Sequence, residues 1–188
     1  MVRNGMRSCV QQMGRCTLAP GAWFTSFDGV TRKVLLDGAY ELTSLCEGTN
    51  LPWFRMVVIV FRGDDLATPE GIYVFFDEGL IHINKKKEVW VRGHQKQFPV
   101  MLSKTLSVSE SQGTIMIVQG SRIKILFSLS GEVTVTVSQS LANELCAPCG
   151  NFNGDDSDDL RLPSGQVVGN ITEVFEAWKA RDLPRSSV

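Results

Sequence analysis

Histidine is scarce in this sequence of 188 residues, which contains only His82 and His94. Neither histidine belongs to a recognisable Ser/His/Asp arrangement, and such an arrangement is what a hydrolase of the triad type requires. We therefore expect no hydrolase, and we find no motif for any other enzyme.

Long hydrophobic runs are also absent. The longest, residues 56–61, has the length of a strand, whereas a membrane span needs about 20 apolar residues. Neither charge is in excess, because 19 Lys and Arg residues offset 20 Asp and Glu residues to a net charge of −1. These absences predict no membrane span and no binding to nucleic acid.

Internal repeats and low-complexity tracts are missing too, and 43% hydrophobic and 21% charged residues are typical of a globular protein. We expect one domain over about residues 14–182, between an N-terminal extension, 1–13, and a C-terminal tail, 183–188. Its dominant hydrophobic period is two, as in Val133, Val135 and Val137. Roughly ten or more such segments between turn residues predict an all-β, antiparallel sandwich or barrel.

A helical pattern occurs only near the C-terminus. Val174, Phe175 and Trp178 form an apolar stripe within residues 171–180, and Asn170 or Thr172 can cap the helix. We expect the helix to pack on the sheet. Asn170 also begins an Asn-Ile-Thr triplet, a candidate N-glycosylation site.

Five cysteines are present, Cys9, Cys16, Cys46, Cys146 and Cys149, so at least one is left over after pairing within the chain. The last two form a CxxC pair that allows a zinc site, a redox site or structural disulfides. The irregular spacing disfavours zinc, and the acidic residues that follow disfavour a reactive thiolate. Disulfides to Cys16 and Cys46 would each close a loop of over a hundred residues, which contributes about 4–5 kcal/mol by the chain-entropy estimate.

The residues that follow the CxxC pair are rich in oxygen ligands. Asn151, Asn153 and Asp155 alternate, and Asp158 and Asp159 follow. Calcium prefers six to eight such oxygens, whereas a solvated acidic turn would have the same composition. The position of Gly154 and the lack of a glutamate at the end of the loop exclude an EF-hand, so both a calcium site and a simple turn remain.

Four segments together resemble the von Willebrand factor type D domain. CAPCGNFNGDDSDDL (146–160) is similar to its C-terminal signature, a CGxCGNFNG-like run followed by paired aspartates. WFTSFDG (23–29) resembles its opening strand, GAYELTSLC (38–46) its GxCxYxLxxxC segment and VFEAWKA (174–180) its last helix. The resemblance covers about residues 14–182.

This resemblance implies a β-sandwich that binds Ca²⁺. Asp28 joins the five residues of the loop as a ligand, and Asp155 uses either its side chain or its backbone oxygen. The implied disulfides are Cys16–Cys149 and Cys46–Cys146, so that two bridges and one ion fasten the first strand to the loop. Metal binding of this kind contributes to folding.

Three departures from the family pattern limit what carries over. PGAWF (20–24) replaces GDPHY, so we expect no Asp-Pro autocleavage. Ala39 replaces a cysteine that in the family bonds to a following eight-cysteine module. Cys9 precedes the domain and is a candidate for an intermolecular disulfide.

The implied function is a non-catalytic, calcium-binding module of a secreted glycoprotein, which mediates adhesion or assembly in mucus or matrix through other extracellular proteins or further modules of its own chain. The alternative is thiol–disulfide exchange through Cys146 and Cys149 during multimerisation. Residues 1–16 contain no signal peptide, so secretion implies a processed or excised chain. Candidate contact surfaces are exposed edge strands and the expected loops 62–71 and 93–105. Trp23, Trp53 and Trp90 are candidate anchors, although Trp90, within a strand, is expected in the core.

Overall fold

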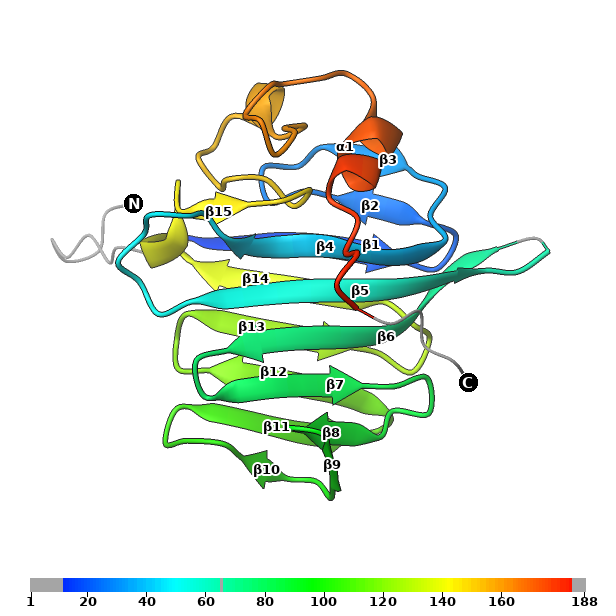
Figure 1. Cartoon of the computed structure of the whole chain (residues 1–188), viewed down its shortest axis with the longest axis vertical. Coiled ribbons are helices and arrows are strands. Elements are labelled where there is room, and N and C mark those ends of the chain that lie inside the picture. The colour runs from blue at the N-terminus through cyan, green and yellow to red at the C-terminus, as the bar shows by residue number, and fades with distance from the viewer. Residues whose placement is uncertain (1–11, 65, 184–188) are drawn as a thin grey trace, which may run out of the picture.

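The computed structural model describes residues 12–64 and 66–183. Two antiparallel sheets face each other as a sandwich, and one short helix follows near the C-terminus (Figure 1). The sandwich and the helix expected from the sequence are confirmed. Cys9 and the tail after Leu183 lie outside the described residues. No helix in the described part of the chain has both the length and the hydrophobicity of a membrane span.

The two sheets contain eight and seven strands. In spatial order the first is β10 (Val100–Met101), β11 (Leu106–Ser111), β12 (Thr114–Gln119), β13 (Ile123–Phe127), β14 (Val133–Ser138), β1 (Met13–Ala19), β2 (Trp23–Thr25) and β3 (Thr31–Lys33). The second, in front of it in Figure 1, is β15 (Leu145–Cys146), β4 (Gly38–Leu45), β5 (Phe54–Arg62), β6 (Ala67–Phe76), β7 (Gly79–Ile83), β8 (Val89–Val91) and β9 (His94–Lys96). Most neighbours are joined by hairpins, but β1 pairs with β14 and β4 with β15, which places early strands next to late ones.

Side-chain alternation explains why these segments form strands. In β13, Ile123, Ile125 and Phe127 are buried between the sheets, whereas Lys124 is exposed. β12 follows the same rule in spite of its continuous apolar sequence, since Met116 is only half-buried. The hydrophobic core therefore lies between the inner faces of the two sheets, as alternating strands require.

The centre of β5 is buried on both of its faces. Val57, whose neighbours Met56 and Val58 face the interior, is itself fully buried because the C-terminal segment covers the outer face at this point. Ala180 and Leu183 of that segment pack beside it. A nearly continuous apolar run, residues 54–61, is the expected sequence for a strand covered on both sides.

Two expectations about the surface are wrong, and a third holds in part. Trp90 is half-buried on the outer face of β8 and not in the core, because Val89 and Val91 on either side of it take the two inward positions. Residues 62–71 are largely strand, since β5 extends to Arg62 and β6 begins at Ala67. The range 93–105 is loop for the most part, as expected, but it also contains the short strands β9 and β10. Strands such as β5 and β9 include polar residues because they pair with a neighbouring strand. The local sequence does not reveal this pairing. Trp23 and Trp53 are exposed.

The helix α1 (Ile171–Ala177) packs on the sandwich through Ile171, Val174 and Phe175, all of which are buried. The Phe175 ring contacts Phe24 of β2 edge-to-face, with 5.1 Å between the ring centroids. Val174 and Phe175 of the expected stripe are therefore confirmed, whereas Trp178 is the half-buried C-cap, because the helix ends at Ala177 and not near residue 180. After the helix the chain crosses to the other sheet, where the Ala180 N–H donates to the Ala39 carbonyl at 2.9 Å and Asp182 pairs with Arg55 at 2.7 Å.

The start of α1 depends on a side-chain cap. The Asn170 side-chain oxygen accepts from the Thr172 N–H at 3.0 Å. We expect Asn170→Ala, in unglycosylated protein, to lower the free energy of unfolding by about 1 kcal/mol, or Tm by roughly 2–4 °C. Asn170→Asp keeps the cap and is the control. Equal losses from both variants, measured by calorimetry, would show that the cap does not matter.

Candidate metal centre

Two disulfides attach the loop of residues 146–160 to the sandwich. Cys149 is bonded to Cys16 of β1, 133 residues earlier, and Cys146 is bonded to Cys46 just after β4, 100 residues earlier. These are the pairs that the resemblance implies. Backbone bonds add to them, because the Cys149 carbonyl accepts from Phe27 and the Cys149 N–H donates to Leu42. The loop is therefore held against both sheets.

Phe152 orients the two asparagines. Its side chain is buried and packs against Phe27, with 6.1 Å between the ring centroids. Gly14 of β1 makes room for it, because a Cβ on Gly14 would lie 2.9 Å from the Phe152 ring. With Phe152 held inward, Asn151 and Asn153 on either side of it both reach Asp158, whose carboxylate accepts from Asn151 at 3.2 Å and from Asn153 at 2.9 Å. Arg161 also donates to it.

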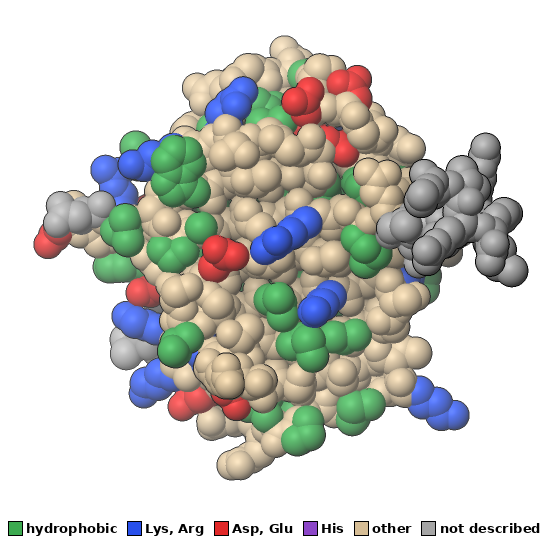
Figure 2. Space-filling view, turned by 180° about the vertical axis from the view of Figure 1, so that it is seen from behind, with side chains coloured by type: hydrophobic (Ala, Val, Ile, Leu, Met, Phe, Trp, Pro, Cys, Tyr) green, Lys and Arg blue, Asp and Glu red, His purple; other side chains and the backbone are tan. Residues whose placement is uncertain are grey.

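Asp28 approaches the same loop from the turn between β2 and β3. Its two carboxylate oxygens accept from the backbone N–H groups of Asn153 at 3.0 Å and Gly154 at 2.9 Å. The structure thus brings Asp28 to residues more than a hundred positions later in the chain. In Figure 2, acidic side chains gather at the top of the molecule, the end at which Figure 1 shows this loop.

Asp159 is the fully buried carboxylate of the cluster. Its Oδ2 accepts from the Ser26 hydroxyl, whereas its Oδ1 is buried with no hydrogen-bond partner among the described residues. Burial raises the pKa of Asp159 to about 7, and repulsion from Asp28 and Asp158 adds to the rise, against the Ser26 hydrogen bond. A buried, partnerless carboxylate oxygen beside two other carboxylates suits a bound cation, which would favour the ionised form.

Asp155 differs from the other five predicted ligands. Its exposed carboxylate accepts from the Ser157 N–H at 3.0 Å and from the Ser157 hydroxyl at 2.6 Å, and these bonds lower its pKa. It thereby caps the 3₁₀ turn η2 (Asp156–Asp158). Asp155 is joined to the rest of the cluster through its backbone N–H, which donates to Asn153 at 2.8 Å.

Two residues of the site were not predicted. Ser26 supports Asp159 and also accepts from the Val30 N–H at 3.0 Å, and its position within the WFTSFDG motif was the available indication. Gly150 has a φ of +89°, and a Cβ there would overlap the Asp159 carboxylate. The glycine of the CGNFNG run is therefore required for both its backbone angle and its close approach.

The donor set is mixed. Within residues 12–64 and 66–183, no three His, Cys, Asp or Glu side chains come together as a metal-binding group. The cluster instead combines Asp carboxylates with Asn amides and backbone groups, and calcium accepts carboxylate, amide and backbone oxygens. His82 in β7 and His94 in β9 lie at the opposite end of the sandwich (Figure 1).

Comparison with known proteins gives a family match and several relatives. Residues 16–166 match the von Willebrand factor type D domain family. The chain is 32% identical to IgGFc-binding protein of Homo sapiens over 187 residues, which are 97% of this chain and 3% of that protein. It is 27% identical to alpha-tectorin of Homo sapiens over 189 residues, 98% of this chain and 9% of that protein.

A third relative, zonadhesin of Mus musculus, is 24% identical over 195 residues, 96% of this chain and 4% of that protein. The chain therefore spans less than a tenth of the length of these three relatives. The family match extends over most of the chain and includes both disulfides and the acidic loop. We conclude that this chain belongs to the von Willebrand factor type D domain family.

Proposed function

We propose that this chain is a non-catalytic, calcium-binding module of an extracellular glycoprotein that serves protein–protein adhesion or assembly. The single observation that carries the calcium part is the buried Asp159 carboxylate, with one oxygen unpartnered and Asp28 and Asp158 nearby. Burial of an uncompensated charge costs several kcal/mol, and a divalent cation offsets this cost.

Asp28, Asn151, Asn153, Asp158 and Asp159 would hold the ion with their side chains. Asp155 would contribute its backbone oxygen, since its carboxylate already caps η2. The ion supplies a hard positive charge that neutralises the carboxylates. Together with the two disulfides it would fasten β1 and the turn after β2 to the loop, which is a structural rather than a catalytic role.

Two features support an extracellular location. Two disulfides that span 133 and 100 residues are typical of an oxidising compartment. Asn170, the predicted glycosylation site, is exposed. Partners would be other extracellular proteins or further modules of a longer chain, and Cys9 stays the candidate for an intermolecular bond.

Removal of calcium should destabilise the protein. At a free concentration of 100 times Kd, calcium stabilises the fold by about 2.7 kcal/mol, so a chelator should lower Tm by roughly 5–10 °C. Asp158→Asn should remove most of this dependence. Asp156→Asn is the matched control in the same loop and should retain it. A melting curve unaffected by the chelator would contradict calcium binding.

Gly150 tests the close packing around Asp159. We expect Gly150→Ala to cost about 2–4 kcal/mol, because the new Cβ would overlap the carboxylate and the φ is +89°. The chelator effect on Tm should also shrink. Gly154→Ala is the control, since Gly154 has a similar φ of +85° but no atom within 4 Å of the added Cβ. Equal effects of the two variants in denaturant unfolding would refute the role given to Asp159.

Thiol–disulfide exchange remains the alternative function, and a thiol count separates it from the structural clamp. Cys16 and Cys149 are fully buried, whereas Cys46 and Cys146 are half-buried. Alkylation of the native protein without reductant, followed by peptide mapping, should leave all four in the pairs Cys16–Cys149 and Cys46–Cys146. Labelling of Cys146 or Cys149 would favour exchange.

A further inference from the structure

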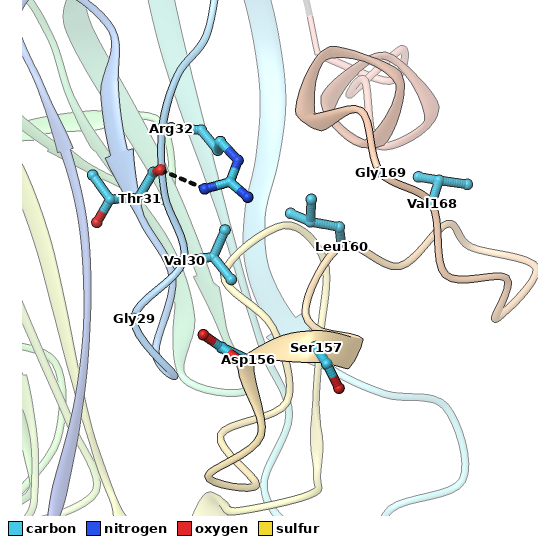
Figure 3. A pocket seen from close by; sticks show the side chains of 9 residues that line it. All are labelled: Gly29, Val30, Thr31, Arg32, Asp156, Ser157, Leu160, Val168 and Gly169. Atoms are coloured by element: carbon cyan, nitrogen blue, oxygen red, sulfur yellow. Dashed lines mark hydrogen bonds between the residues drawn. The ribbon is translucent and has the colours of Figure 1, made fainter.

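A pocket of about 360 Å³ opens beside the acidic loop. Its walls come from three segments: residues 29–32, the loop residues Asp156, Ser157 and Leu160, and residues 168–169 before α1 (Figure 3). We propose that this pocket binds an extended segment of a partner protein, which adds to the edge of β3 and places an acidic and a basic side chain in the pocket. This inference deepens the adhesive role above and rests on it.

The first argument is the free edge of β3. This strand is the last in its sheet, pairs only with β2, and all three of its residues are exposed. The Thr31 carbonyl accepts from the guanidinium of Arg32, its own neighbour, at 2.8 Å, and Figure 3 shows this bond at the pocket. Edge strands present unpaired backbone groups to which a peptide can add as a further strand.

The second argument is a pair of opposite charges. Arg32 and Asp156 both line the pocket and are exposed, and among the described residues neither takes part in a salt bridge. In Figure 3 their charged groups lie on opposite sides of Val30. A ligand with a carboxylate for Arg32 and a cation for Asp156 would form charge-assisted hydrogen bonds with both.

The third argument is a small apolar part of the pocket lining. Val30 and Leu160 are almost fully buried and expose only small parts of their side chains there, and Val168 is half-buried. The Val168 N–H donates to the Leu160 carbonyl at 2.8 Å, which holds the two side chains in a fixed hairpin. We therefore expect an apolar residue between the acidic and the basic residue. Because side chains of a strand alternate, all three occupy every second position.

The proposed calcium ligands are neighbours in sequence of residues that line this pocket. Gly29 follows Asp28 directly, and Asp156 and Ser157 lie between Asp155 and Asp158. Two of the three walls therefore begin at proposed calcium ligands. An ion at those ligands would order the walls, and its charge would lower the repulsion between the acidic loop and the carboxylate of the peptide.

The probe is the peptide acetyl-Gly-Glu-Thr-Val-Thr-Lys-Gly-amide, titrated into the calcium-loaded chain and followed by NMR. We expect saturable shifts of the backbone amide signals of residues 30–33 and 168–169. The same peptide with Gln at both charged positions should bind at least about tenfold more weakly. Equal binding of the two peptides, or binding of neither, would overturn the proposal.

Two variants give the matched test in the protein. Arg32→Glu should weaken binding of the charged peptide at least about tenfold. Lys33→Glu makes the same charge change at the next exposed residue of β3, which does not line the pocket, and should leave binding within about twofold. Equal effects of the two variants would mean that only net charge matters, and the pocket would be rejected.

The chelator experiment on the same samples separates this inference from the calcium proposal. Arg32→Glu should keep the normal fall in Tm on chelation, because Arg32 is not a proposed ligand. A normal fall in Tm with no peptide binding would reject the pocket alone. Charge-dependent peptide binding without any effect of the chelator would reject calcium and retain the pocket.

Discussion

A carboxylate that is fully buried at one end of the sandwich is the constraint on which this part of the molecule depends. Asp159 has one oxygen bonded to Ser26 and the other without a partner, so its charge has to be offset by its surroundings. The residues around Asp159 reflect this requirement for charge compensation. Gly150 leaves room for the carboxylate, and Asp28 and Asp158 bring further oxygens. The proposed ion would offset the charge of Asp159 and reduce its repulsion with these two carboxylates.

The CxxC pair and the acidic loop act as parts of one arrangement. The disulfides hold the loop to β1 and to the end of β4, on the two different sheets. Phe152, buried between the two asparagines, sets their direction. A loop with so many polar groups would otherwise sample many conformations, and the bridges reduce that freedom before any ion binds. The two disulfides therefore orient the side chains of the acidic loop before any ion binds.

The same loop forms one wall of the proposed binding pocket beside β3 through Asp156, Ser157 and Leu160, which alternate along the chain with proposed calcium ligands. A short edge strand with opposite charges beside it suits a segment that contributes its backbone for affinity and its side chains for selectivity. The two strands that end the long sheet are both short, β3 and β10, which limits unspecific pairing along the sheet. Only β3 lies next to the acidic loop.

Sequence alone determined the strands, the helix and the chemistry of the loop, because alternation, capping and oxygen-rich composition are local properties. It did not predict the position of Trp90. In a strand of only three residues, such as β8, the alternation is too short to show which side chains face the core. Asp28 entered the site only through the family resemblance, and Ser26 and Gly150 only through the structure. Contacts across more than a hundred residues, such as Ser26 to Asp159, arise when the two sheets close and the disulfides join the early strands to residues 146–149. Tertiary structure therefore decided how the local pieces meet, and with it the burial of Asp159 and the pocket beside it.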